Sequence, residues 1–289
     1  MIGPPGAGKS LLARTLPTVL PPLSGAERME VSRIHSAAGR LPGGGLLSTR
    51  PFRSPHHSAS RAALLGGGAP CRPGELSLAH RGVLFLDELP EFGRDVLEGL
   101  RQPLEEGVVQ IARSHGSYLF PARTQLVAAA NPCPCGHLGS PLHPCSCPPA
   151  LAHTYLGRLS GPLLDRFDLQ LFLTPVPYAD IIGTGSSESS VVVAKRVTIA
   201  RDRQQERLGE GGCNATMTPA QVRRFCRLPE GGEALLRGAV ERLGLSVRAH
   251  DRVLKLARTI ADLAGSAIAV EHLAEAIQYR SLDRLRPGA

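Results

Sequence analysis

A glycine-rich run at the start of the chain restricts the fold more than any other feature of the sequence. Gly3-Pro4-Pro5-Gly6-Ala7-Gly8-Lys9-Ser10 matches the pattern G-x-x-x-x-G-K-[ST]. In such a loop the glycines let backbone N–H groups turn toward bound phosphates. Lys9 then reaches the β- and γ-phosphates, and the Ser10 hydroxyl binds Mg²⁺. A glycine-rich turn before an amphipathic helix is the alternative. The residues after Ser10 have a helical pattern up to Pro17, as a phosphate loop requires, so the sequence predicts a site for ATP and Mg²⁺.

A second motif supplies the carboxylates that nucleotide hydrolysis needs. Residues 82–88, "GVLFLDE", form a short apolar run that ends in Asp87 and Glu88. This pattern indicates a strand buried on both faces of a parallel sheet. We expect Asp87 to hold Mg²⁺ through water and Glu88 to polarise the attacking water, because that water must lose a proton as it attacks. An acidic strand end that faces solvent is the alternative, and the phosphate loop upstream argues against it.

Three residues further along the chain are candidates for sensing or stabilising the γ-phosphate. Asn131 ends the next buried strand, "QLVAAAN", where its amide can bind both the phosphate and the water. Arg166, in "GPLLDRFD", precedes the last expected strand and is placed to reach a neighbouring subunit's nucleotide. Arg248 begins a helix of the C-terminal part and is expected to touch the γ-phosphate of its own subunit. A turn before Pro132 is the alternative for the asparagine, and a solvated surface charge is the alternative for each arginine.

Four cysteines are crowded into a proline-rich stretch after Asn131. Cys133, Cys135, Cys145 and Cys147 have the spacing C-x-C-x₉-C-x-C. Four thiolates on a short loop can bind Zn²⁺ tetrahedrally, which would give a structural site that stiffens the loop. The usual pair is C-x₂-C, so His137 and His143 are substitutes if one cysteine points away. A loop with reduced, unliganded thiols is the alternative.

Composition and the expected domain boundaries complete the outline of the chain. Its 289 residues are 42% apolar, which is enough for a sizeable core, and carry a net charge of +8. The charge fits a polyanion partner such as DNA, although at 4% aromatic residues no stacking platform is evident. Without an apolar run of about 18 residues or a signal sequence, we expect no membrane span and a cytoplasmic location.

We expect a P-loop α/β domain with a parallel sheet flanked by helices, then a small all-helical domain. The expected parts are a nucleotide domain at 1–182 with an insertion at 39–75 and a Cys-rich loop at 132–149, a linker at 183–190, and a helical domain at 191–289.

The order of these motifs resembles the magnesium-chelatase-like AAA+ ATPases and, within them, the ComM (YifB) family. The resemblance lies in "RPFRSPHHSAS", "LLGGGAPCRPGELSLAHRGVLFLDELPEF", "FPARTQLVAAANPCPCG", "RLSGPLLDRFDL" and "SVRAHDRVLKLARTIADLAG". It implies an AAA+ module with a helical lid and a hexameric ring with ATP sites between subunits. By position, Lys9 and Ser10 match Walker A, Asp87 and Glu88 match Walker B, Asn131 looks like sensor 1, Arg166 like the arginine finger and Arg248 like the sensor 2 arginine. It also implies a DNA motor for branch migration during natural transformation.

The front of the chain departs from that family, whose members carry an N-terminal domain and a first AAA+ strand ahead of the phosphate loop. Here only Met1 and Ile2 precede the loop, so we expect a piece of a longer protein with exposed ladder groups beside the missing strand. Two alternatives to the DNA motor are an ATPase subunit of a magnesium-chelatase-like metal-insertion complex and an inactive fragment.

Two basic segments are candidates for DNA contact. One is the insertion around His56 and His57, with Arg50, Arg53 and Arg61; the other is a hairpin near 108–121, with Arg113 and His115. For the two histidines, loop packing or a polar contact is the favoured interpretation over metal binding or catalysis. A solvated basic loop is the alternative for both segments.

Overall fold

The computed structural model describes residues 1–41, 43, 45–113, 116–159, 161–176 and 188–280. The chain divides into two compact units. The first comprises Met1–Arg166 with Phe172–Ser187, and the second comprises Phe167–Leu171 with Glu188–Ala289. Most of the expected linker, 183–187, lies outside the described residues, and Ser190 already begins a helix. No helix in the described part of the chain is long and apolar enough to cross a membrane.

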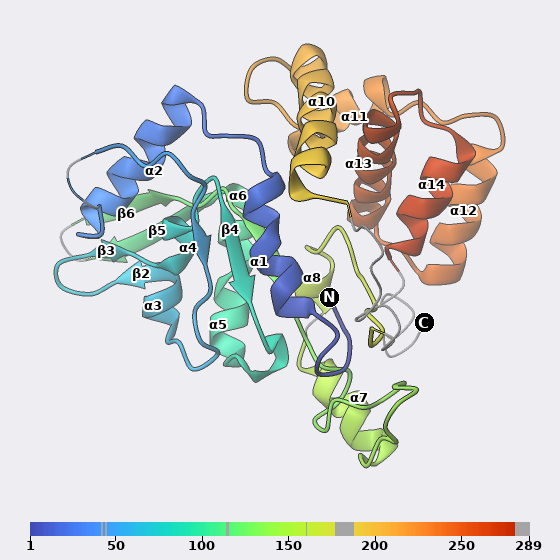
Figure 1. The fold of residues 1–289 in the computed structure, drawn as a ribbon, viewed down its shortest axis with the longest axis horizontal. Helices are drawn as coiled ribbons and strands as arrows, with labels where there is room; N and C mark the ends of the chain where they lie inside the picture. Colours follow the sequence, from blue (N-terminus) through green and yellow to red (C-terminus); the bar gives the residue numbers. More distant parts are fainter. Residues whose placement is uncertain (42, 44, 114–115, 160, 177–187, 281–289) are drawn as a thin grey trace. The chain divides into compact units, whose positions relative to one another are not determined.

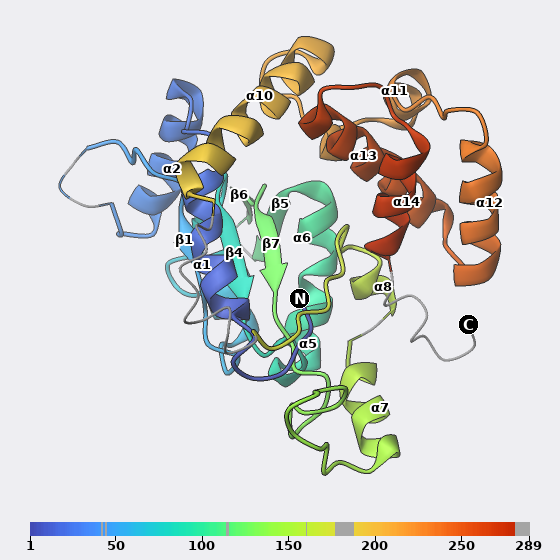
Figure 2. The ribbon, with the colours of Figure 1, turned by 45° about the vertical axis from the view of Figure 1, so that its right-hand side comes forward.

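A small parallel sheet forms the centre of the first unit. Strands β1 (Phe52–Arg53), β4 (Val83–Leu86) and β7 (Gln125–Ala128) lie side by side in the order β1-β4-β7, as Figure 2 shows. All four residues of β4 are buried, because a central parallel strand is covered on both faces. Helix α1 (Lys9–Val19) lies beside β4 (Figure 1). Its Ala13 belongs to one buried apolar cluster with Phe85 of β4. The parallel sheet with flanking helices is confirmed.

Residues before the phosphate loop extend the sheet. Ile2 forms parallel bridges to Ala130 on one side and Phe172 on the other, and is 4% exposed. The Gly3 N–H donates to the Ala130 carbonyl at 3.2 Å, and the Leu173 N–H donates to the Ile2 carbonyl at 2.8 Å. At this end of the sheet the ladder groups of Ala130 are therefore paired rather than exposed. The last expected strand is reduced to the single bridge at Phe172.

Two helix boundaries differ from the sequence prediction. Helix α1 continues past Pro17 to Val19, although a proline lacks the N–H that bonds the carbonyl four residues back. The loss falls in the last turn, where the Thr18 hydroxyl donates to the Thr15 carbonyl at 2.7 Å. The pattern of residues 93–107, "GRDVLEGLRQPLEEG", predicts one helix, but the structure has two short helices, α5 (Arg94–Gly99) and α6 (Arg101–Glu106), which meet at Leu100.

The rest of the first unit is built mostly from short elements. The expected hairpin is present between β4 and β7: β5 (Val108–Arg113) pairs antiparallel with β6 (Gly116–Pro121), whereas His115 lies outside the described residues. The insertion contains a second two-stranded sheet, β2 (Gly66–Gly67) with β3 (Arg72–Pro73). The remaining elements of the unit are α2 (Gly25–Ala37), α3 (Arg61–Leu65), α4 (Glu75–Leu78), the 3₁₀ turn Leu89–Glu91, α7 (Pro149–Gly157) and α8 (Gly161–Leu164).

The second unit is helical, as the sequence predicts. Its longest core helix, α13 (Val247–Ala264), begins at Ser246, whose hydroxyl accepts the Ala249 N–H. The apolar face of α13 packs with α14 (Val270–Gln278) through fully buried Val253, Ala257 and Leu273. The other helices are α10 (Ser190–Leu208), the 3₁₀ turn Asn214–Thr216, α11 (Pro219–Phe225) and α12 (Gly232–Leu243).

Candidate functional site

The glycine-rich loop leads directly into helix α1. Gly6 has φ 80° and Gly8 has φ 77°, a left-handed conformation that side chains disfavour. Gly8 immediately precedes Lys9, the first residue of the helix. The first N–H groups of a helix have no partner within the helix, so the motif predicts an anion site at this turn.

Lys9 is folded back over this loop. Its Nζ donates to the Gly3 carbonyl at 2.5 Å, the Pro4 carbonyl at 2.9 Å and Asn131 Oδ1 at 3.1 Å. Burial lowers the pKa of Lys9, and the nearby Asp87 carboxylate opposes this shift. The Lys9 residue is 9% exposed and its ammonium is held by oxygens, so phosphate oxygens can replace these partners without leaving it unpaired.

Two candidate Mg²⁺ ligands are in direct contact. Ser10, in the first turn of α1, donates its hydroxyl to Asp87 Oδ2 at 2.7 Å. Asp87 follows the last residue of β4, and its other oxygen accepts the Glu88 N–H at 3.0 Å. A hydroxyl and a carboxylate oxygen are ligands of the kind Mg²⁺ takes. The structure thus brings together two residues that the sequence places 77 positions apart.

Glu88 has an unexpected partner. Its backbone is left-handed, with φ 52° and ψ 46°, and its side chain is 51% exposed. Oε2 of Glu88 lies 2.9 Å from Nδ1 of His57, whose ring contacts the ring of His56 at a centroid distance of 4.1 Å. The polar contact expected of these histidines is therefore with the candidate catalytic carboxylate. Sequence reasoning missed this pairing because it did not identify β1, the two-residue strand that brings the insertion alongside β4.

We predict that His57→Ala raises the basal rate of ATP hydrolysis. The imidazole competes with water for the Glu88 carboxylate, so its removal frees the base. A partly exposed pair is worth about 0.2–1 kcal/mol, which limits the increase to about fivefold. The measurement is steady-state hydrolysis at saturating ATP. His56→Ala is the matched control, since His56 Nδ1 contacts the Ser58 hydroxyl instead. A slower His57 variant would show that His57 assists catalysis.

The two candidate arginines lie in different units. Arg166 is 11% exposed and anchored on its own unit: its guanidinium donates to the Arg101 carbonyl at 2.9 Å, the Pro162 carbonyl at 2.6 Å and Glu105 at 2.7 Å. Arg248 is the second residue of α13 in the helical unit and is exposed. For Arg166 to contact the nucleotide of another subunit, its guanidinium would have to break the ion pair with Glu105.

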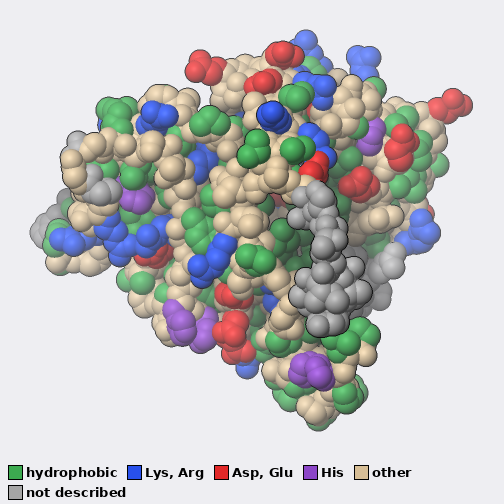
Figure 3. Space-filling view, viewed as in Figure 1, with side chains coloured by type: hydrophobic (Ala, Val, Ile, Leu, Met, Phe, Trp, Pro, Cys, Tyr) green, Lys and Arg blue, Asp and Glu red, His purple; other side chains and the backbone are tan. Residues whose placement is uncertain are grey.

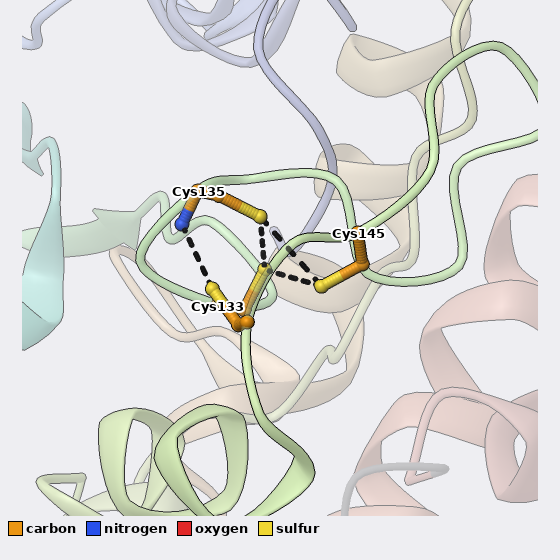
Figure 4. Close-up of side chains that lie close together, drawn as sticks. Cys133, Cys135 and Cys145 are labelled. Atoms are coloured by element: carbon orange, nitrogen blue, oxygen red, sulfur yellow. Dashed lines mark hydrogen bonds between the residues drawn. The ribbon is translucent and has the colours of Figure 1, made fainter.

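The four cysteines converge, as Figure 4 shows for the three that it labels. The sulfur atoms of Cys133 and Cys135 are 3.4 Å apart, those of Cys133 and Cys145 are 3.7 Å apart, and those of Cys135 and Cys145 are 3.6 Å apart. The Cys147 sulfur completes the group, and all four sulfurs lie within 4.8 Å of one another. Hydrogen bonds from the backbone N–H groups of His137 and Ser146 lower the pKa of Cys135 to about 5. The group can hold a metal ion without the histidine substitutes.

The basic residues of the insertion are engaged within the unit. Arg53 forms a two-pronged pair with Glu75 at 2.5 and 2.8 Å. Arg50 donates to the carbonyls of Pro21 and Arg81 and to Glu27. Contact of Arg50 or Arg53 with DNA phosphates would therefore need to displace these partners.

A phosphate loop beside the carboxyl ends of a parallel sheet, with a helical unit after it, defines the AAA+ ATPase fold with a helical lid. The chain belongs to the magnesium chelatase family: residues 1–181 match the model for magnesium chelatase, subunit ChlI, and residues 187–280 match the model for its C-terminal part.

Curated relatives match over almost the whole chain. The uncharacterized protein YifB of Escherichia coli K12 is 47% identical over 288 residues, which cover 99% of this chain and 56% of YifB. The competence protein ComM of Haemophilus influenzae is 46% identical over 286 residues, covering 98% of this chain and 55% of ComM. The chain therefore spans little more than half the length of these relatives.

Proposed function

We propose that this chain binds ATP·Mg²⁺ and hydrolyses the γ-phosphate. The observation that carries the proposal is the contact between Ser10 and Asp87 at 2.7 Å, next to Lys9. In the proposed roles, residues 3–8 and Lys9 hold the phosphates while Ser10 and Asp87 hold Mg²⁺. Glu88 takes the proton of the attacking water. ATP and Mg²⁺ are the cofactors that the AAA+ family implies.

We propose further that the active form is a ring, a hexamer by analogy with the family, with ATP sites shared between subunits. Asn131 already contacts Lys9 and would orient the water and γ-phosphate as sensor 1. Arg166 would act on a neighbour's nucleotide, and Arg248 would act as sensor 2. An arginine supplied by a neighbouring subunit stabilises the charge of the transition state.

The proposed substrate of the motor is DNA, with helicase or branch-migration activity in DNA uptake and recombination. Three observations support it: the similarity to a competence protein, the net charge of +8, and basic side chains gathered over β2 and β3 (Figure 3). Arg113, at the end of β5, is exposed and donates to the carbonyl of Gly68, the residue after β2, at 3.5 Å. Both a DNA partner and reduced thiols fit the cytoplasm.

A metal-insertion ATPase is the second candidate. The matched family model is that of a magnesium chelatase subunit, and the ATP chemistry would be the same. Its partner would be a tetrapyrrole-binding enzyme instead of DNA, so stimulation by DNA separates the two proposals.

The DNA proposal predicts that branched DNA accelerates ATP hydrolysis several-fold. Arg113→Glu should abolish the acceleration and leave the DNA-free rate unchanged, because the substitution puts a negative charge beside DNA phosphates and touches no nucleotide residue. The matched control is Arg237→Glu on α12, which is exposed and remote from the hairpin in sequence. Hydrolysis that does not respond to DNA, in a chain that hydrolyses ATP, would contradict the DNA motor and favour the second candidate.

We also propose Zn²⁺ as the ion of the cysteine cluster (Cys133, Cys135, Cys145 and Cys147). Four thiolates in tetrahedral array are typical of structural zinc sites. The ion would stiffen the loop that follows Asn131.

A further inference from the structure

The loop that carries the cysteine cluster has little else to hold it together. Residues 131–148, all of which the structure describes, form neither helix nor strand. Leu138 and Leu142 are 45% and 65% exposed, so they contribute no core. A loop of this length without regular structure is uncommon in a compact domain and is usually functional when it is ordered.

The cluster has the dimensions of a filled tetrathiolate site. Four sulfurs at about 2.3 Å from a central ion lie about 3.8 Å apart. The measured separations of 3.4 to 3.7 Å among three of the sulfurs approach that spacing. Two backbone N–H groups also point at sulfur: that of Cys135 at Cys147, and that of Leu138 at Cys133, each at 3.4 Å. The loop is therefore folded around its sulfurs.

The same loop touches the phosphate loop. Gly136 directly follows Cys135 of the cluster. It is buried and has a left-handed backbone, with φ 82°. A Cβ at this position would be 2.7 Å from Cδ and 2.9 Å from Cγ of Pro5. The Gly136 N–H donates to the Cys133 carbonyl at 2.9 Å, which ties the contact to a cluster cysteine. No side chain fits between the cysteine loop and Pro5.

We propose that the metal-loaded cysteine cluster braces the phosphate loop, so that metal content sets the affinity for nucleotide. The ion holds Gly136 against Pro5 on one side. On the other side, Cys133 follows Asn131 by two residues, and Asn131 bonds Lys9. Loss of the ion releases both contacts. The phosphate loop must then be ordered by the nucleotide itself, which weakens binding. This inference rests on the proposed ATP site and concerns its regulation.

Two kinds of variant separate the ion from the brace. Cys145→Ser with Cys147→Ser removes two ligands. Gly136→Ala keeps all four ligands, but its methyl group would clash with the ring of Pro5. Gly139→Ala is the matched control, because Gly139 has φ 74° in the same loop and a Cβ there would meet nothing within 4 Å. Cys71→Ser controls for the loss of a thiol outside the cluster.

The experiment measures zinc and iron per chain by elemental analysis, and the Kd of a fluorescent ATP analogue by titration in the presence of Mg²⁺. We expect about one zinc in the wild-type chain, Gly136→Ala and both controls, and little in the double cysteine variant. The Kd should rise about tenfold or more in Gly136→Ala and in the double variant, and stay unchanged in the controls. Thermal unfolding of each variant shows whether it is folded, and Gly136→Ala keeps the test decisive if the double variant is not.

Each contrary result overturns a different part of the proposal: the zinc assignment, the support of the phosphate loop, or the ATP site itself. A wild-type chain without zinc overturns the zinc assignment, and iron in its place does the same. Zinc-loaded Gly136→Ala with wild-type affinity overturns the brace alone. A wild-type chain that binds no nucleotide overturns the proposed ATP site and the brace with it, whereas a failure of DNA stimulation leaves both standing.

Discussion

Glu88→Gln is expected to bind ATP as tightly as the wild-type chain and to hydrolyse it about 10²–10⁴-fold more slowly, the usual contribution of a positioned general base. Glutamine has the size of glutamate and can still accept a hydrogen bond from His57, but it cannot take a proton from water. Glu88 is exposed at the end of β4 and lies one residue from Asp87, where an attacking water can reach it.

The measurement compares single-turnover hydrolysis with the Kd of an ATP analogue in the same preparation. Glu91→Gln is the matched control: it lies in the 3₁₀ turn after Glu88, is comparably exposed, and pairs with Arg158 at 3.4 Å. Hydrolysis by Glu88→Gln within a few-fold of the wild-type rate would remove Glu88 from the proposed chemistry.

The second large effect is on the stability of the helical unit. Asp262 on α13 is 1% exposed and is surrounded by donors. It accepts hydrogen bonds from Arg207 at 2.5 and 3.0 Å, from Arg258 at 3.1 Å and from Asn214 at 2.7 Å. The hydrogen bonds that Arg207 donates to Asp262 raise the pKa of Arg207. Asp262→Ala leaves two largely buried guanidinium groups without their anion, which costs about 3–5 kcal/mol.

Denaturant unfolding followed by circular dichroism measures this loss, as a shift of the helical unit's transition to lower denaturant. Asp251→Ala is the control on the same helix, because Asp251 is 37% exposed and its side chain pairs with the neighbouring His250. An exposed pair contributes about 1 kcal/mol or less. Equal midpoints for the two variants would show that the buried network does not stabilise the unit.

The elements with a strong local pattern were predictable from the sequence. The run before Asp87 forms the fully buried β4, and the hairpin near 108–121 pairs as expected. The second unit is helical, as its sequence pattern predicts. Pro17 misled the prediction because a proline in the last turn of a helix costs a single hydrogen bond.

The contacts that the sequence did not reveal join residues that are distant in the chain or carry no pattern. His57 meets Glu88 because a two-residue strand pairs with β4, and two residues have no periodicity to detect. Gly136 meets Pro5 through backbone packing that depends on the folded loop. The phosphate loop, Ser10 and Asp87 were predictable as a set because each belongs to a motif. The catalytic roles assigned to Asn131, Arg166 and Arg248 stay predictions.

We propose that this chain hydrolyses ATP at the phosphate loop in sites shared between subunits. The most direct test is the Mg²⁺-dependent hydrolysis rate as a function of protein concentration, for the wild-type chain and for Lys9→Ala. We expect the wild-type rate per chain to rise with concentration and Lys9→Ala to stay at the background rate at every concentration. No Mg²⁺-dependent hydrolysis at any concentration, or equal rates for the two proteins, would contradict the proposed shared ATP site.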